Sequence, residues 1–199
     1  MKAREFFAFD KPLAVTAVVL SGIGLLFIYS ASCYSAELTY GDPFRYVETQ
    51  AVALVLGVAA MLALSFLRPE KLQKAAAPLF LLGIALLAAV FIPGLGVESY
   101  GAKRWLDLGF FTVQPSEYAK YAMAVFLAAF AAKRGVHTFP RALFFLASAG
   151  VVCLLLLMEP NMSVTLCVGA AAFALLFAAG AKPSHLIIIL IPVVICGVA

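Results

Sequence analysis

Charged residues are scarce in this sequence. Asp, Glu, Lys and Arg together make up 12% of its 199 residues, and 65% of the residues are hydrophobic. A typical soluble domain has about 25% charged residues. With a mean hydropathy of +1.07, the chain has too few polar groups to cover a surface in water, so the composition excludes a soluble globular protein.

Residues that usually hold metal ions are also few. The chain has two histidines, and its four cysteines form no C-x-x-C pair and have no histidine at ligand spacing. The cysteines lie within or at the ends of apolar runs: Cys33, Cys153, Cys167 and Cys196. We expect them to be small membrane-helix residues, and we expect His137 and His185 to be solvated or to face lipid headgroups. The sequence therefore predicts no metal site built from side chains.

Long apolar runs make up most of the chain. A helix needs about 20 apolar residues to cross a bilayer, and these runs lack the alternation typical of barrel strands. The predicted spans are Pro12–Cys33, Thr49–Leu67, Ala75–Ile92, Pro115–Ala132, Ala142–Met158, Asn161–Ala179 and Pro183–Ala199. We predict an all-α, polytopic transmembrane helix bundle with about seven spans, forming a single domain over residues 1–199.

Lysine and arginine are distributed unevenly between the predicted loops. If the N-terminus is cytoplasmic, all basic residues except Arg45, Lys103, Arg104 and Lys120 fall on the cytoplasmic side. Cytoplasmic loops carry an excess of Lys and Arg, so we predict a cytoplasmic N-terminus. The net charge of +4 then follows from topology and gives no support to nucleic-acid binding.

Charges gather in the stretch GAKRWLDLGFFTVQPSEYAK, residues 101–120, on the predicted outer side between the third and fourth spans. Glycines interrupt regular structure here, while Trp105, Leu106 and Phe110 are too apolar for a freely solvated loop. We predict a segment that folds back onto the membrane surface. Pro115 suits the first turn of the helix that follows.

Three charged residues of this stretch are candidates for function. Glu117 falls in the first helical turn, where it complements the helix dipole, and Lys120 follows at i+3 on the same face. Ionisable groups near membrane depth tend to face an interior cavity, although mutual neutralisation is the simpler alternative. Arg104, beside Trp105, has the planar geometry that holds a diphosphate through two parallel hydrogen bonds.

These residues closely resemble the signature of the SEDS proteins, the shape, elongation, division and sporulation family represented by FtsW, RodA and SpoVE. The stretch is joined by GIGLLFIYSAS at 22–32, DPFRYVETQ at 42–50 and EPNMSVT at 159–165, so the resemblance covers nearly the whole chain. The form IPGLGVESYGAKRW at 92–105 is more similar to the division and sporulation branch than to the elongation branch.

The resemblance implies a peptidoglycan glycosyltransferase that polymerises lipid II at the outer face of the bacterial cytoplasmic membrane. This activity serves cell division, sporulation or cell-shape control, usually with a class B penicillin-binding protein. The expected partners are therefore lipid II, that protein and membrane lipids, and no nucleic acid.

The implied reaction needs a base for the acceptor hydroxyl and cations for the departing polyprenyl diphosphate. Arg104 and Lys120 are expected to supply the cations, and Glu117 to orient Lys120 or to help hold a divalent cation, for which the sequence offers no dedicated site. Substrate-binding roles are expected along the same stretch: Lys103, Arg104, Trp105, Gln114, Ser116 and Lys120. For Trp105 an aromatic-belt anchor is the commoner alternative, and for Lys103 a solvated charge.

The chain departs from the family pattern in two ways. The family's frequent PDLGTA is PNMSVT here, and Asn161 cannot act as an anion, although it can cap the sixth helix. SEDS proteins are also expected to have ten spans, with the catalytic-base Asp in a large outer loop after the seventh. We therefore expect this chain to be the N-terminal portion, to lack that base, and to be inactive alone.

Two other functions stay open. A lipid II flippase or other lipid transporter should carry polar groups through the bundle, whereas the middles of the predicted spans are almost free of ionisable residues. A noncatalytic, truncated membrane scaffold is the third possibility. The reading frame downstream of codon 199 distinguishes the scaffold from the polymerase.

Overall fold

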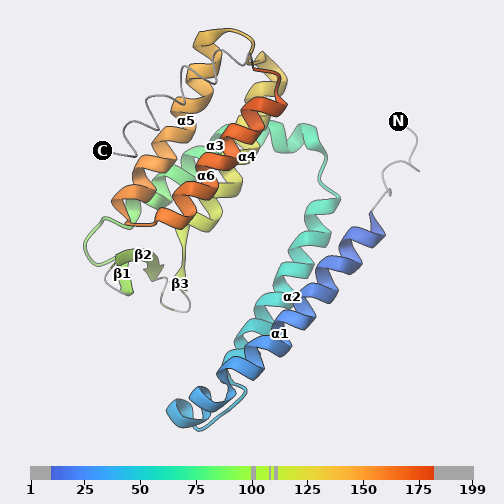
Figure 1. The fold of residues 1–199 in the computed structure, drawn as a ribbon, viewed down its shortest axis with the longest axis vertical. Helices are drawn as coiled ribbons and strands as arrows, with labels where there is room; N and C mark the ends of the chain where they lie inside the picture. The colour runs from blue at the N-terminus through green and yellow to red at the C-terminus, as the bar shows by residue number, and fades with distance from the viewer. Residues whose placement is uncertain (1–9, 100–101, 108, 110–111, 182–199) are drawn as a thin grey trace. The chain divides into compact units, whose positions relative to one another are not determined.

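The computed structural model describes residues 10–99, 102–107, 109 and 112–181. The chain divides into two compact units, residues 1–68 and 69–199, and each is described by itself. Within the described residues, Figure 1 shows a helical protein with one small sheet. The all-α fold class is confirmed, and the sheet is the one departure from it in this part of the chain. The predicted span Pro183–Ala199 lies outside the described residues.

The first unit is a helical hairpin of α1 (Lys11–Tyr40) and α2 (Arg45–Ser65), which pack side by side (Figure 1). Asp10 caps α1 because its Oδ1 accepts a hydrogen bond from the Leu13 N–H at 3.1 Å. The helix ends at Gly41, which has the left-handed φ of 69° that glycine adopts without strain.

The helices of this hairpin present apolar side chains outward. Ala36 is the single buried residue between positions 10 and 68, although the hydropathy of both helices is high. Large exposed side chains such as Leu26 and Val55 would be unfavourable in water but suit lipid or further helices.

Four described helices, α1, α2, α3 and α5, are long and apolar enough to cross a membrane, and α6 is a shorter apolar helix. The multi-pass membrane character is therefore confirmed, while the total of about seven spans stays a prediction. Several helices extend beyond the predicted spans: α1 continues past Cys33 to Tyr40, and α3 begins at Pro69 rather than Ala75. The predicted spans stop where polar residues interrupt the apolar sequence, but the helices continue through those polar residues.

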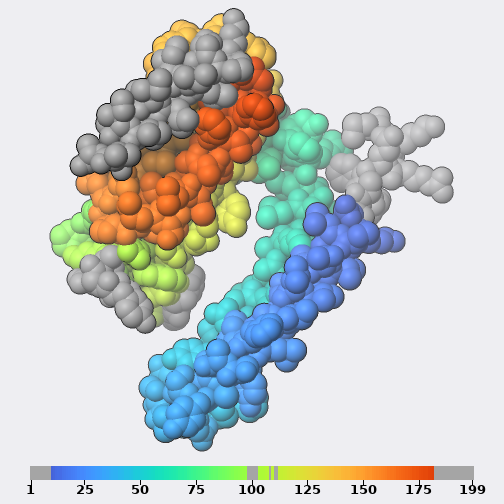
Figure 2. Space-filling model, in the orientation of Figure 1, coloured from blue at the N-terminus to red at the C-terminus, as the bar shows by residue number. Residues whose placement is uncertain are grey.

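The second unit is a bundle of α3 (Pro69–Ala89), α4 (Pro115–Arg134), α5 (Phe139–Met158) and α6 (Met162–Ala178). Helices α4 and α5 each contact the other three helices of this bundle. Small residues bring α3 close to α4: a Cβ added at Gly83 would lie 3.3 Å from the Ala119 Cα. In the space-filling view, α5 and α6 form adjoining strips of one surface (Figure 2).

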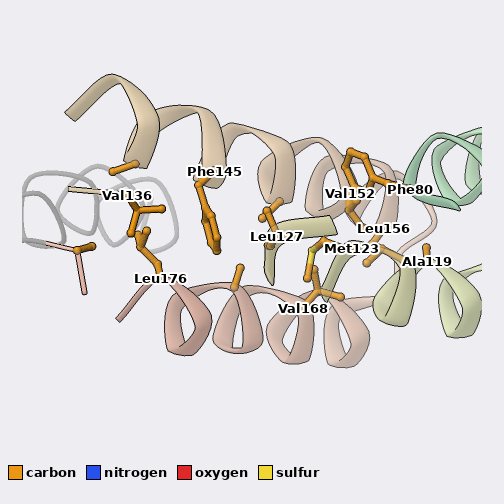
Figure 3. Close-up of a cluster of buried hydrophobic side chains, with 14 of the residues drawn as sticks. Phe80, Ala119, Met123, Leu127, Val136, Phe145, Val152, Leu156, Val168 and Leu176 are labelled. Atoms are coloured by element: carbon orange, nitrogen blue, oxygen red, sulfur yellow. The ribbon is translucent and has the colours of Figure 1, made fainter. Parts of the chain in front are cut away.

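A cluster of buried apolar side chains fills the core of this bundle. Figure 3 shows side chains from all four helices meeting in it, with Leu127 and Phe145 fully buried near the middle. Further buried members of the cluster include Phe80, Met123, Val152, Leu156, Val168 and Leu176.

A three-stranded antiparallel sheet connects α3 to α4, with strand order β1-β2-β3. Its strands are β1 (Gly96–Ser99), β2 (Ala102–Asp107) and β3 (Thr112–Val113). The pairing sets Ser99 opposite Ala102 and Leu106 opposite Val113. Glycine is required at position 96, where a Cβ would collide with the Val90 carbonyl oxygen.

The sheet was not predicted from the sequence, which indicated only a segment folded back on the membrane surface. Its strands are short, and its apolar residues do not form a clear alternating pattern. Residues 96–99 and 102–107 flank a Tyr-Gly pair, and a glycine in a two-residue connection is the signal that would have favoured a hairpin.

Candidate functional site

Arg104 is fixed by the turn between α5 and α6. Its Nε donates to the Glu159 carbonyl oxygen at 3.2 Å, and its Nη2 donates to the Pro160 carbonyl oxygen at 2.5 Å. Helix α5 has no basic residue in its last turn, so Arg104 supplies the cation that the carbonyl end of this helix favours. The contact joins β2 to the α5–α6 turn. We call the region formed by the sheet, the start of α4 and this turn the sheet end.

Glu159, whose backbone carbonyl oxygen accepts from Arg104, is buried, with 1% of its surface exposed. Neither of its carboxylate oxygens has a hydrogen-bond partner among the described residues. Burial raises the pKa of Glu159 to about 7, although the positive charge of Arg104 acts in the opposite direction. The carboxyl group is therefore balanced between its neutral and charged forms near neutral pH.

This balance predicts a pH-dependent stability. The folded-state pKa of Glu159 lies above the ordinary value of 4.5, so the folded protein holds a proton that the unfolded chain releases. The stabilisation is complete below the ordinary pKa and is lost as pH rises through about 7. In thermal unfolding of the full-length protein, we expect the wild type to lose about 1–3 kcal/mol more than Glu159→Gln between about pH 5 and about pH 8. Parallel pH profiles for the two proteins would contradict this expectation.

Glu117 and Lys120 form the predicted i, i+3 pair on the first turns of α4. The Lys120 Nζ donates to both Glu117 carboxylate oxygens, at 2.9 and 3.0 Å. Pro115 occupies the first turn of α4, as predicted. The Glu117 side chain is 51% exposed and that of Lys120 27%, so the pair stays accessible from outside the bundle and contributes about 1 kcal/mol or less to stability.

The remaining candidates are distributed over the same end. Lys103 is exposed, and Trp105 and Gln114 are half-buried. Gln114 occupies the N-cap position of α4 without a side-chain cap hydrogen bond. Ser116 is fully buried, and its Oγ has no hydrogen-bond partner among the described residues. Ser116 therefore faces the protein interior in this structure.

Two buried residues of the sheet end were not among the site residues predicted from the sequence. The sequence indicated Glu159 only as the first residue of the EPNMSVT motif, and its position directly after an apolar span is the signal that marks such a residue. Asn161 is buried and occupies the N-cap position of α6, but its side chain makes no cap hydrogen bond. The predicted capping position is confirmed, and the predicted capping contact is wrong.

In the described part of the second unit, buried polar side chains lie only at the sheet end. Among the described residues, the buried polar side chains are Ser116, Glu159 and Asn161; one is at the start of α4 and two are in the α5–α6 turn. In the same part of the chain, no group of three or more His, Cys, Asp or Glu is placed to hold a metal ion. Helix α4 also contacts β2, so the fold gathers Arg104, Glu117 and Lys120 at one end.

These features define a multi-pass membrane protein in which the buried polar side chains of the described residues lie at the sheet end. The family model of the cell cycle proteins FtsW, RodA and SpoVE matches residues 11–199, and the chain belongs to this family, the SEDS proteins.

Similar proteins point to the division branch of that family. A probable peptidoglycan glycosyltransferase FtsW of Alkalilimnicola ehrlichii is 36% identical over 181 residues, which cover 87% of this chain and 44% of that protein. An FtsW of the same description from Nitrosococcus halophilus is 34% identical over 182 residues, covering 90% and 47%. The chain thus spans about half the length of these curated relatives.

Solved structures show the same fold. The rod shape determining protein RodA of Thermus thermophilus matches with a TM-score of 0.66 at 29% identity, over 87% of this chain and 58% of RodA. A chain of a peptidoglycan synthase complex matches with a TM-score of 0.70 at 27% identity, over 94% of this chain and 53% of that chain.

Proposed function

We propose that the full-length protein is a peptidoglycan glycosyltransferase that polymerises lipid II at the outer face of the bacterial cytoplasmic membrane during cell division. The observation that supports this most is the placement of polar groups. The core cluster between the helices is apolar, whereas the charged and buried polar groups of the described bundle interior gather at the sheet end. A transporter would need polar groups along a path across the bilayer.

The proposed reaction joins two lipid-linked sugars. The acceptor hydroxyl oxygen bonds to the anomeric carbon of the donor sugar, and the bond from that carbon to the diphosphate oxygen breaks with its electron pair leaving on the diphosphate. The hydroxyl proton goes to a general base, expected in the part of the family's proteins beyond residue 199. Residues of the sheet end supply cations for the leaving diphosphate.

Arg104 and Lys120 are the proposed cations. Two N–H groups of Arg104 are held by backbone carbonyls, so the guanidinium is fixed in place while its other N–H groups stay available to phosphate oxygens. Lys120 is held by Glu117, and both stand at the N-terminal end of α4, where the helix dipole also favours an anion. Lys103, Trp105 and Gln114 are proposed to contact the substrate around these cations.

A class B penicillin-binding protein is the proposed partner. One similar structure is described as coordinating polymerization and crosslinking in a peptidoglycan synthase complex. A polymerase at the outer face would deliver its glycan to a crosslinking partner on the same side of the membrane.

The function is tested with full-length protein, purified and incubated with fluorescently labelled lipid II, and with its penicillin-binding partner added in a parallel reaction. We expect a ladder of glycan products on a gel. Transport of labelled lipid II across vesicles without any ladder would instead support a flippase, and neither activity would support a scaffold.

The outward position of the site predicts a labelling pattern. Ser99 in β1 and Thr138 before α5 lie at opposite ends of α4, whose 20 residues span about 30 Å, the thickness of the bilayer core. In intact cells carrying single cysteines in a cysteine-free protein, we expect an impermeant thiol reagent to label Ser99→Cys and not Thr138→Cys. The reverse pattern would place the proposed site in the cytoplasm.

A further inference from the structure

A groove runs along α4 between α3 and α5, away from the sheet end. It consists of two adjoining hollows of about 660 and 390 Å³. Both are lined by Ala77 of α3, Phe126 of α4 and Phe144 of α5, so they form one continuous feature. We call it the α3–α5 groove.

One mouth of the α3–α5 groove is positively charged. Lys74, Lys133 and Arg134 line it, and none of the three has a carboxylate within ion-pair distance in the described part of the chain. The acidic residue of the first turn of α3, Glu70, lines the neighbouring hollow between α3 and α4, which shares Gln73 and Ala129 with this one, and Glu70 is not among the residues that line the mouth. The Lys and Arg asymmetry of the sequence places this mouth on the cytoplasmic side.

The rest of the groove is apolar and partly aromatic. The Phe80 and Phe126 rings stack with centroids 4.4 Å apart, and the Phe130 and Phe144 rings approach to 4.9 Å. Between Lys74 and Leu81, α3 rises about 10 Å, so the groove passes from the cationic mouth into the depth of the hydrocarbon. Both flanking helices, α3 and α5, are long and apolar enough to cross a membrane.

We propose that the α3–α5 groove binds an anionic glycerophospholipid of the cytoplasmic leaflet. The lipid phosphate lies against Lys74, Lys133 and Arg134, and one acyl chain lies along Phe126 and Phe144. Cations beside an anionic leaflet attract such headgroups, and each added cation strengthens the attraction.

The depth of the groove favours a lipid over a protein segment. A peptide in the hydrocarbon region must satisfy its own backbone groups, and it would also need an acidic end to match the mouth. A phospholipid has no backbone to satisfy and carries its charge at one end of a long apolar chain. It is also the solvent already present at that depth.

The test compares lipids bound to the full-length protein by native mass spectrometry. The protein is incubated with phosphatidylglycerol or phosphatidylethanolamine of the same acyl chains. The groove variant combines Lys74→Gln, Lys133→Gln and Arg134→Gln, and a matched control variant combines Lys11→Gln, Arg68→Gln and Lys71→Gln. We expect the wild type and the control to prefer phosphatidylglycerol, and the groove variant to lose about ten-fold or more of that preference. Equal loss in both variants, or no preference in the wild type, would overturn the proposal.

A second measurement locates the lipid without removing charge. The sequence has one tryptophan, so Phe144→Trp in a Trp105→Phe background reports on the groove alone. Phosphatidylglycerol with brominated acyl chains should quench this fluorescence more than brominated phosphatidylethanolamine does. Equal quenching by the two lipids would show only general solvation and would overturn the proposal. Loss of quenching upon binding of a protein partner at the same mouth would identify a protein docking surface instead.

Discussion

Replacing Arg104 with alanine in the full-length protein is expected to reduce glycan polymerisation by about 100-fold or more while membrane insertion is retained. A fixed donor opposite developing negative charge typically contributes a factor of about 10²–10³ to turnover. The two carbonyl hydrogen bonds of Arg104 hold its guanidinium before the substrate arrives, so little reorganisation is needed when the diphosphate departs. The measurement is the initial rate of polymer formation from labelled lipid II, with protein level in the membrane as the control for folding.

Two further substitutions separate anchoring from charge at this position. Arg104→Lys keeps the charge but cannot bridge the carbonyl oxygens of Glu159 and Pro160 with a planar group, so we expect a loss close to that of the alanine variant. Arg104→Gln keeps an N–H donor for one carbonyl but has no charge. Wild-type polymerisation by Arg104→Gln would show that Arg104 only joins β2 to the α5–α6 turn, and wild-type polymerisation by Arg104→Ala would remove it from the site.

The helices could be predicted from the sequence because a long apolar run in lipid folds as a helix unless it forms part of a closed barrel. Backbone groups in hydrocarbon must be satisfied within the segment, so each run up to residue 179 corresponds to a helix. Their ends were less predictable, since a helix continues through polar residues outside the hydrocarbon until something stops it. For α1 that stop is Gly41 with its positive φ.

The arrangement of the sheet end was much harder to predict. The Glu117–Lys120 pair is local and follows from helix geometry alone, whereas Arg104 meets Glu159 across 55 residues of sequence. Such a contact depends on how α5 and α6 pack beside the sheet, and no periodic pattern encodes it. The raised pKa of Glu159 was unpredictable for the same reason, because it depends on burial and not on sequence neighbours.

Replacing Lys120 is expected to lower the rate of polymerisation as much as replacing Arg104 does. The effect of replacing its partner Glu117 distinguishes two roles for that carboxylate. Lys120→Ala removes a cation at the N-terminal end of α4, so we expect polymerisation by the full-length protein to fall by about 100-fold. If Glu117 only orients Lys120, Glu117→Gln removes an accessible ion pair that contributes about 1 kcal/mol. The polymerisation rate of Glu117→Gln should then fall by about five-fold, because about 1.4 kcal/mol corresponds to a ten-fold change in rate and about 1 kcal/mol to about five-fold.

A general base at position 117 would behave differently. Its replacement by glutamine would cost about 10²–10⁴ in rate, as much as or more than the loss of Lys120. The matched control is Glu37→Gln, which removes a carboxylate near the end of α1 that has no role in the proposed reaction, and it should leave the rate unchanged. We expect the Glu117 loss to stay small because the carboxylate is occupied by the Lys120 ammonium through both oxygens, which leaves it poorly placed to accept a proton. If Glu117→Gln lowers the rate as much as Lys120→Ala does, with Glu37→Gln at wild-type rate, the base would lie within residues 1–199 and the proposed division of roles would be overturned.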